Sequence, residues 1–258
     1  RNLATGGQAS TQTQADGYYS FAVAQGSYDV TASKFGYQGV LVQNVQVLAN
    51  TTTQLDFPLM ALPSGLIRGR VTRATDRQPV PAVVRLVGTT GEAVVDSQGY
   101  YSFSVPAGTY LVRAVATLPG YRGSERQNVT LAVGDVLTLD FTLTPAPSIL
   151  LVDADAWASS YAISYYRSAL DNLLYSYDTW AISDFPANNP SAYKLAQYDL
   201  VIWVQPKTSP GYIAAWSELA DYLGQGGRLL ISGEDIGYWD YQSGMAATYR
   251  SYLHANYL

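Results

Sequence analysis

The sequence contains no cysteine, so disulfide bonds, thiolate nucleophiles and cysteine metal ligands are all excluded. Lysine is also scarce, with only Lys34, Lys194 and Lys207 in 258 residues, and the single histidine is His254. Charged residues make up 14% of the chain, whereas tyrosine occurs 22 times. This polar but weakly charged composition favours an extracellular protein over a cytoplasmic enzyme.

Basic charge is missing above all from the C-terminal part. Residues 1–147 carry ten basic and nine acidic side chains, but residues 148–258 carry five and eleven. We therefore expect no nucleic-acid partner, because phosphate neutralisation needs a basic face. No apolar run approaches the roughly 20 residues that cross a bilayer, and no signal-peptide pattern opens the sequence, so we expect no membrane span.

The sequence does contain a long repeat. The pattern Gly-Tyr-Tyr-Ser-Phe, followed by Gly-x-Tyr-x-Val-x-Ala, begins at Gly17 and again at Gly99, 82 positions later. The two copies also share a closing Leu-Asp-Phe, at 55–57 and 139–141. A repeat of this period indicates a domain that occurs twice.

The second copy has the pattern of an all-β domain. Its apolar residues Tyr101, Phe103 and Val105 alternate with serines, as in a strand with one buried face. A glycine turn and a second alternating stretch at 110–114 follow, which predicts a β-hairpin. Further strands are predicted at 67–71, 82–87, 129–133 and 137–143. About seven short strands in roughly 80 residues predict a β-sandwich.

The first copy is shorter. Residues 1–16 are too few to supply the strands that the second copy has between 67 and 87. We therefore expect a partial sandwich over 1–62, a complete one over 65–144, and a chain that is a fragment of a longer protein.

The repeated pattern resembles the carboxypeptidase regulatory-like family of transthyretin-like sandwiches. The resemblance covers 65–144 in full and 1–62 in part. It implies spacer and adhesion modules attached to secreted enzymes, especially peptidases, with no catalytic residues to transfer. Some related pilin sandwiches form Lys–Asn isopeptide bonds, but residues 65–144 contain no lysine.

The pattern changes after the Pro-Ala-Pro-Ser of 145–148. Continuous apolar runs of the kind found in buried parallel strands alternate with amphipathic stretches. Strands are predicted at 149–152, 177–182, 200–204 and 228–232, and helices at 161–175 and 212–223. This order predicts an α/β domain with a doubly wound parallel sheet.

Three phrases in this part are distinctive: Leu-Leu-Val-Asp-x-Asp from Leu150, Tyr-Asp-Leu-Val-Ile-Trp from Tyr198, and Tyr-Leu-x-x-Gly-Gly-Arg from Tyr222. They resemble the flavodoxin-like, glutamine-amidotransferase-like domain found in C-terminal regions of secreted bacterial proteins, including subtilisin-type peptidases. The resemblance covers 148–258. Only four of the usual five strands are visible, so we expect this domain to be incomplete at its C-terminus. The family's nucleophilic cysteine is absent.

Ligands of such sheets bind at the carboxyl ends of the strands. The polar residues expected there are Asp153, Asp155, Gln205, Glu234 and Asp235. Their carboxylates form either a cation site, with Ca²⁺ or Mg²⁺ at the Asp153/Asp235 edge, or a set of helix caps and turn anchors. Capping is the favoured role for Asp155, which precedes a predicted helix. No cofactor is otherwise expected.

A sharper enzymatic hypothesis is a Mg²⁺-dependent phosphotransferase. The acidic layout resembles haloacid-dehalogenase-like enzymes, with Asp153 as nucleophile, Asp155 as acid/base, and Asp235 with Asp240 holding Mg²⁺. Two features oppose this resemblance. Trp157 stands where that family has a small residue, and neither lysine of this domain opens a helix before the fourth strand.

Tyrosine and histidine suggest two more kinds of site. The pairs Tyr18–Tyr19 and Tyr100–Tyr101 could form a carbohydrate-stacking platform, but we favour one ring of each pair in the core and the other on a turn. Serine-peptidase chemistry within this chain is not expected, because no Gly-x-Ser-x-Gly or subtilisin-like Gly-Thr-Ser-Met motif occurs. His254 lies instead in a predicted terminal helix over 252–257.

Taken together, these patterns predict a non-catalytic accessory or spacer region of a larger secreted or cell-surface bacterial enzyme, with a subtilisin-type serine peptidase favoured. The expected partners are the catalytic domain of the parent chain and a protein or polysaccharide surface.

Overall fold

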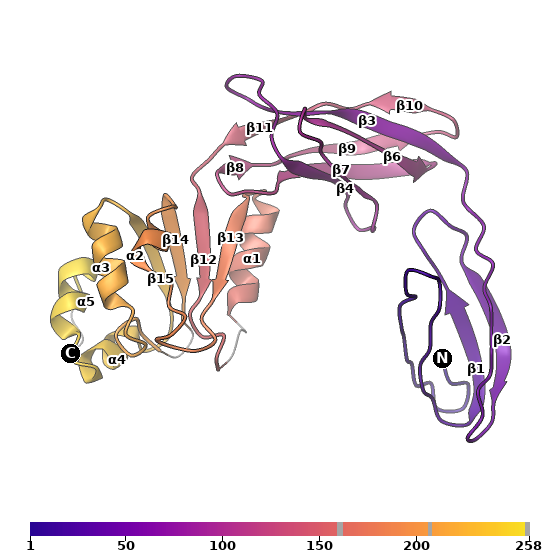
Figure 1. The fold of residues 1–258 in the computed structure, drawn as a ribbon, viewed down its shortest axis with the longest axis horizontal. Coiled ribbons are helices and arrows are strands. Elements are labelled where there is room, and N and C mark those ends of the chain that lie inside the picture. Colours follow the sequence, from indigo (N-terminus) through magenta and orange to yellow (C-terminus); the bar gives the residue numbers. More distant parts are fainter. Residues whose placement is uncertain (159–161, 206–207, 256–258) are drawn as a thin grey trace.

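A computed structural model describes residues 1–158, 162–205 and 208–255. Its strands form a two-stranded sheet, the two sheets of a sandwich, and a four-stranded parallel sheet. In Figure 1 the sandwich lies between the other two parts, and the two chain ends lie far apart. The three modules therefore form an arch, with the first and third modules extending to the same side of the sandwich, and strand is the main secondary structure.

The first module contains β1 (Gly26–Ala32) and β2 (Val40–Val47), which pair antiparallel. The segments 18–23 and 55–59, which repeat the sequence of strand segments in the second module, do not form strands. In the second module the matching segments pair with a neighbouring strand, which has no counterpart in residues 1–16. Without a neighbour, a segment has no ladder partners for its N–H and C=O groups, so alternation alone does not make it a strand.

The second module is a two-sheet sandwich. Its strands are β3 (Ser64–Arg73), β4 (Ala82–Leu86), β5 (Glu92–Val94), β6 (Tyr100–Pro106), β7 (Gly108–Ala116), β8 (Tyr121–Arg122), β9 (Ser124–Leu131), β10 (Val136–Thr138) and β11 (Phe141–Pro145). One sheet has the order β10-β3-β11-β8, with β6 also pairing β3, and the other has the order β5-β4-β7-β9. Between them Ile67, Val84, Val112 and Phe141 are fully buried.

The predicted hairpin of 101–105 and 110–114 is wrong. β6 pairs with β3, whereas β7 pairs with β4 and β9 in the opposite sheet. The chain turns a corner between the sheets at Pro106, whose carbonyl accepts a hydrogen bond from the Tyr110 hydroxyl at 2.8 Å. A hairpin and a corner both bury alternate residues, so the pattern could not separate them.

The strand predicted at 137–143 is interrupted between β10 and β11. The Leu139 carbonyl crosses over Gly69, where a Cβ atom would lie only 2.1 Å from that oxygen. Asp140 Oδ1 accepts a hydrogen bond from the Arg70 N–H at 2.8 Å. A side chain therefore replaces one rung of the ladder between β3 and its parallel neighbours.

The third module alternates strands and helices. Its elements are β12 (Ile149–Asp153), α1 (Ile163–Asn172), β13 (Tyr177–Ala181), α2 (Ala192–Leu195), β14 (Leu200–Val204), α3 (Trp216–Gly224), β15 (Arg228–Ser232), α4 (Ile236–Gln242) and α5 (Ala246–Leu253). All four strands are parallel, in the order β13-β12-β14-β15. One face of the sheet packs against α1 and the other against α3.

The four predicted strands of this module are present, but the helices differ. The stretch predicted as a helix from 212 begins only at Trp216, because turns occupy 210–214. The C-terminal helix α5 ends at Leu253, so the helix predicted at 252–257 is confirmed at 252–253 and wrong at 254–255; residues 256–258 lie outside the described part. The sequence patterns missed α2 and α4, which are too short to show a clear helical period.

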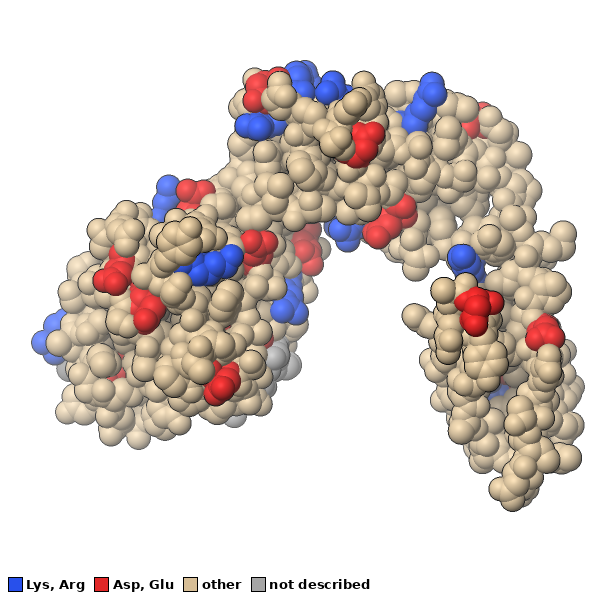
Figure 2. Space-filling model, viewed as in Figure 1, with Lys and Arg blue, Asp and Glu red and all other residues tan. Residues whose placement is uncertain are grey.

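Charges are sparse on the surface. On the face shown in Figure 2, blue and red side chains are scattered among uncharged ones over all three modules. Within the described residues, no helix has the length and apolarity needed to cross a membrane.

Candidate functional site

The carboxyl edge of the parallel sheet was the predicted site, and it begins at Asp153. This residue ends β12 and is only 4% exposed, with Ala181 and Val204 beside it in the sheet. Leu151 and Val204 belong to the cluster packed against α1. Because side chains alternate along a strand, Asp153 lies on the α1 face.

Asp155 lies in the turn that follows β12 and is 2% exposed. Its main-chain carbonyl accepts a hydrogen bond from the Ala158 N–H. Helix α1 begins at Ile163, with Ala162 at its N-cap and no side-chain cap bond. The expectation that Asp155 caps this helix is therefore wrong.

Gln205 lies on the other face of the sheet and is fully buried. Its Oε1 accepts a hydrogen bond from Trp203 Nε1 at 2.8 Å, and its Nε2 donates to Thr208 Oγ1 at 2.7 Å. Both ends of the amide are thus used to fix the chain after β14. We conclude that Gln205 orders the loop rather than facing a ligand shared with Asp153.

Glu234 and Asp235 follow β15 and are exposed. Asp235 has a left-handed backbone and occupies the N-cap position of α4 without a side-chain cap bond. Among the described residues, no three Asp, Glu or His side chains lie close enough together to hold a metal ion. The predicted Ca²⁺ or Mg²⁺ site therefore has no assembled ligand set there, and it stays a prediction.

Asp240, a magnesium ligand in the phosphotransferase hypothesis, is committed elsewhere. It is fully buried in α4, and its carboxylate accepts hydrogen bonds from the Gly211 N–H and from Trp216 Nε1, both at 2.9 Å. Burial raises the pKa of Asp240, against the lowering effect of its hydrogen bonds from Ser209, Gly211 and Trp216. This carboxylate joins the loop after β14 to α3 and α4.

The lysine that the phosphotransferase hypothesis needs is not supplied by Lys194. Its ammonium group donates to the Tyr198 hydroxyl at 2.7 Å, and that hydroxyl donates to Asp178 at 2.6 Å. Asp178 and Tyr198 lie at the amino ends of β13 and β14, opposite Asp153. The other candidate, Lys207, lies outside the described residues.

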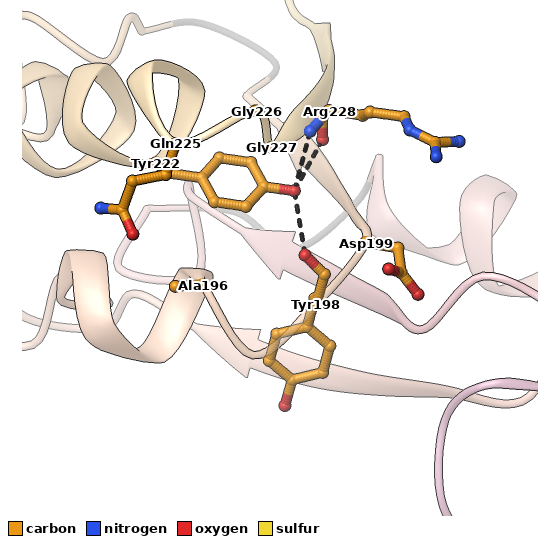
Figure 3. A pocket seen from close by; sticks show the side chains of 8 residues that line it. All are labelled: Ala196, Tyr198, Asp199, Tyr222, Gln225, Gly226, Gly227 and Arg228. Atoms are coloured by element: carbon orange, nitrogen blue, oxygen red, sulfur yellow. Dashed lines mark hydrogen bonds between the residues drawn. The ribbon is translucent and has the colours of Figure 1, made fainter.

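A hollow of about 230 Å³ lies at the amino ends of β14 and β15 (Figure 3). The Tyr222 hydroxyl lies within 3.2 Å of the carbonyl oxygens of Tyr198 and Arg228, and it accepts a hydrogen bond from the Arg228 N–H at 3.0 Å. A Cβ atom at Gly227 would lie 2.3 Å from the Tyr222 ring. These groups join α3 to the two strands, so we assign the hollow a structural role.

One ring of the second tyrosine pair lies in the core, as the favoured interpretation predicts, but its neighbour Tyr100 lies in β6 rather than on a turn. Tyr101 is 5% exposed, whereas Tyr100 is 52% exposed and has the Arg70 guanidinium 5.3 Å from its ring centre. Tyr19 is half-buried and Tyr18 is 60% exposed. In the part of the chain that the structure describes, neither exposed ring has an aromatic neighbour, so no flat stacking platform forms around them.

The sequence patterns missed a row of aromatic rings along the carboxyl edge, which we call the aromatic edge. It consists of Trp157, Phe185, Tyr212, Trp239 and Tyr238, with successive ring centres 5.0, 5.7, 5.1 and 5.2 Å apart. Each of the four segments that follow the strands contributes at least one ring. The signal was an aromatic residue within eight positions after every strand, which helical and strand periodicities do not register.

The junctions between modules are the other sites with specific contacts. At one of them, β8 pairs with β11 on one side and forms a bridge to Tyr175 on the other. The Gly123 N–H donates to the Leu174 carbonyl at 2.7 Å, and the Ser176 N–H donates to the Tyr121 carbonyl at 2.9 Å. The sandwich thus continues, through main-chain hydrogen bonds, into the turn after α1.

At the other junction, the Phe35 ring of the first module packs against the core of the second. It lies over Gly91, where a Cβ atom would be 2.6 Å from Phe35 Cε1. The fold and these contacts define a class of protein in which a two-stranded β module, a β-sandwich and a parallel α/β module are joined directly to one another.

The family of the sandwich modules follows from comparison with known proteins. Residues 1–60 and 66–144 match the family model of the carboxypeptidase regulatory-like domain, which covers more than half of the chain. The chain belongs to this family.

Among curated proteins, Bacillopeptidase F of Bacillus subtilis (strain 168) is 30% identical over 122 residues. The match covers 46% of this chain and 8% of that protein, so the chain spans only a small part of its relative.

Several solved structures are similar to parts of the chain. A type II cohesin–X-dockerin complex from Acetivibrio cellulolyticus has 26% identity and a TM-score of 0.27, covering 31% of this chain and 58% of that one. The Bacillus anthracis TIE protein has 14% identity and a TM-score of 0.26, covering 46% and 25%. A streptococcal ancillary pilin has 14% identity and a TM-score of 0.26, covering 51% and 50%.

Proposed function

We propose that this chain is a non-catalytic accessory region of a secreted bacterial peptidase of the subtilisin type, and that it holds the catalytic domain at a set distance from a protein or polysaccharide surface. Family membership supports an accessory role, and the match to a protein named Bacillopeptidase F supports a peptidase as the parent. The proposed domains are a partial sandwich over 1–62, a sandwich over 65–144 and an α/β domain over 148–258.

The observation that carries the proposal is the junction at β8. A spacer must resist bending, and this junction replaces a flexible linker with main-chain hydrogen bonds between the sandwich and the α/β module. Ser176 adds two contacts, because its hydroxyl accepts from the Tyr121 N–H at 3.1 Å and donates to the Tyr121 carbonyl at 2.9 Å. Arg122 Nε donates to the Leu173 carbonyl at 3.0 Å.

We further propose a flavodoxin-like identity for the α/β module. Its parallel order β13-β12-β14-β15 corresponds to the first four strands of the order 2-1-3-4-5 of that fold. The enzymatic role of such a module would need convergent groups at the carboxyl edge, whereas Asp153 and Gln205 lie on opposite faces of the sheet and Asp240 is committed to Gly211 and Trp216.

The spacing function is tested by distances across the junction. Because the chain has no cysteine, Thr138→Cys and Asp221→Cys provide unique sites for spin labels. Double electron–electron resonance should give one narrow distribution of the distance between the two labels. The double variant Arg122→Ala/Ser176→Ala should broaden it, and Arg85→Ala, at an exposed residue of β4, should not. A broad distribution in the unmodified chain would refute a rigid spacer.

The proposal that the chain is non-catalytic is tested by titrating Mg²⁺ and Ca²⁺ into the unmodified chain and into the Asp153→Asn variant. Hydrolysis of an aryl phosphate is measured in parallel. We expect no turnover in either protein. Calcium binding without turnover, lost in Asp153→Asn, would identify a structural ion site. Turnover that disappears in the variant would make this chain a phosphotransferase and refute the accessory role.

A further inference from the structure

The aromatic edge has the properties of a binding surface. Its rings remain partly accessible, with Trp157, Tyr212 and Tyr238 each about two-fifths exposed. Open α/β sheets bind their ligands at the carboxyl ends of the strands, where these rings lie. Tyrosine and tryptophan offer large contact areas with few rotatable bonds, and they are enriched where proteins bind one another.

The segments that carry the rings are fixed to one another. The Trp157 N–H donates to the Ile182 carbonyl, and Asn189 Nδ2 donates to the Ile213 carbonyl at 2.7 Å. The bond from Gly211 to Asp240 joins the next pair of segments. A row that is ordered in this way loses little conformational entropy on binding.

The charge of the segments around the rings is mainly negative. The segments that follow the four strands, 154–162, 182–191, 205–215 and 233–245, contain five carboxylates and one basic residue, Lys207. Asp184 precedes Phe185 directly, and Glu234 and Asp235 precede Tyr238 by a few residues; all three carboxylates are exposed. This arrangement favours a cationic ligand, because carboxylates pair with a cation and ring faces attract it.

The arrangement of the rings favours a peptide ligand over a sugar ligand. Neighbouring rings are tilted by 45° to 75°, so they do not offer the coplanar faces on which a glycan chain stacks. Successive ring centres, 5.0 to 5.7 Å apart, form a row whose spacing is somewhat shorter than the distance of about 6–7 Å between alternate side chains of an extended peptide. Because rings at this spacing contact one another, alternate side chains of such a peptide would lie over the accessible faces and edges of the rings rather than between them.

We propose that the aromatic edge binds an extended segment of a partner protein whose alternate side chains are arginine or lysine. This inference deepens the accessory role, on which it rests, by naming the chemistry of the surface that the α/β module would contact. The rings hold the aliphatic stems and cationic heads of the peptide, and the exposed carboxylates of Asp184, Glu234 and Asp235 neutralise its charge.

The test is calorimetric titration of the chain with a synthetic peptide in which arginine alternates with threonine. Peptides with glutamine or glutamate in place of arginine, and the sugars cellohexaose and chitohexaose, form the other arms. We expect binding of the arginine peptide alone, weakening as salt is added. Equal binding of the glutamine or glutamate peptide, binding of a sugar instead, or no binding of the arginine peptide would overturn the proposal.

Variants locate the site. Trp157→Ala and Tyr212→Ala should each weaken binding about tenfold or more, as expected for aromatic rings that make the main contacts with a ligand. Glu234→Gln/Asp235→Asn should weaken it less and reduce its salt dependence. Tyr193→Ala removes a ring that is 80% exposed on α2, outside the aromatic edge, and should have no effect. Circular dichroism checks that each variant is folded, and Tyr212→Phe should retain binding if the ring is what matters.

An equal loss of affinity in Tyr193→Ala and Tyr212→Ala would also contradict the proposed site. The distances across the β8 junction keep the two proposals separate. If they stay narrow while the arginine peptide does not bind, the binding inference fails and the spacer function stands.

Discussion

The hydroxyl of Tyr101 donates a hydrogen bond to the main-chain carbonyl of Leu139 at 2.5 Å, from one side of β3 to the other in the second module. The first module repeats this contact, with Tyr19 donating to the Leu55 carbonyl at 2.6 Å. The aromatic neighbours are also repeated, since Tyr19 lies 6.2 Å from Phe57 and Tyr101 lies 6.4 Å from Phe141. The repeat therefore preserves a three-dimensional contact even where the first copy lacks the surrounding strands.

Removing this contact should destabilise the second sandwich. Tyr101→Phe leaves the Leu139 carbonyl without its side-chain donor, which typically costs about 1–2 kcal/mol. Chemical denaturation that follows the sandwich transition measures the loss. Tyr100→Phe, at a ring that is 52% exposed, should change the free energy of unfolding by less than about 0.5 kcal/mol. Equal effects of the two changes would show that the hydrogen bond contributes nothing.

An alanine should be tolerated at the end of α3 but should be destabilising in the turn between α3 and β15. Gly227→Ala places a methyl group 2.3 Å from the Tyr222 ring and should destabilise the α/β module by about 1–3 kcal/mol. Gly224→Ala is the matched control, because its Cβ meets no atom within 4 Å and alanine is the better helix former. Thermal unfolding compares them, and a neutral Gly227→Ala would mean that Tyr222 moves away at little cost.

The junction of the first two modules should depend on Phe35. Phe35→Ala removes the ring that lies over Gly91 and packs against the sandwich core, so the modules should move more independently. Spin labels at Leu41→Cys and Thr138→Cys should report a broader distance distribution. Leu48→Ala, at a side chain that is 67% exposed, serves as the control. If the Phe35 variant keeps the unmodified distribution, other contacts hold this junction.

Asp240 should make the α/β module less stable as pH rises. Burial raises its pKa in the folded state, so the folded protein binds this proton more tightly than the unfolded chain does. The free energy of unfolding should therefore fall as pH increases from the ordinary aspartate value, about 4, through the raised value. Above that range it should no longer depend on this group.

Asp240→Asn removes this titration. The stability of the unmodified protein minus that of the variant should decrease as pH rises through the same range, in addition to a constant loss from the altered hydrogen bond to Trp216. Denaturation at a series of pH values measures the difference, and Asp221→Asn, at an exposed site of α3, is the control. A difference that grows with pH would contradict the raised pKa.

Local patterns were sufficient for much of the fold. The repeat at Gly17 and Gly99, the apolar alternation around Tyr101 and the buried run from Ile149 each reflect a requirement that neighbouring residues meet together, namely a turn conformation, one buried face or two buried faces. The same patterns failed where a strand depends on a pairing partner that lies far along the chain. Residues 18–23 have the alternation of a strand but no neighbouring strand to pair with, and Pro106 directs β7 into the sheet opposite β6.

The candidate site divides in the same way. The sequence by itself placed Asp153, Gln205 and Asp235 at the ends of the first, third and fourth strands of the α/β module, because all strands of a parallel sheet end at the same edge. Only the tertiary structure decided where their side chains lie. Strand alternation and the packing of α1 and α3 put Asp153 and Gln205 on opposite faces of the sheet. The carboxylate of Asp240 accepts hydrogen bonds from Gly211 and Trp216, which lie more than 20 residues away along the chain. The aromatic edge likewise exists only in three dimensions, since the folded sheet brings together rings that the chain keeps more than 20 residues apart.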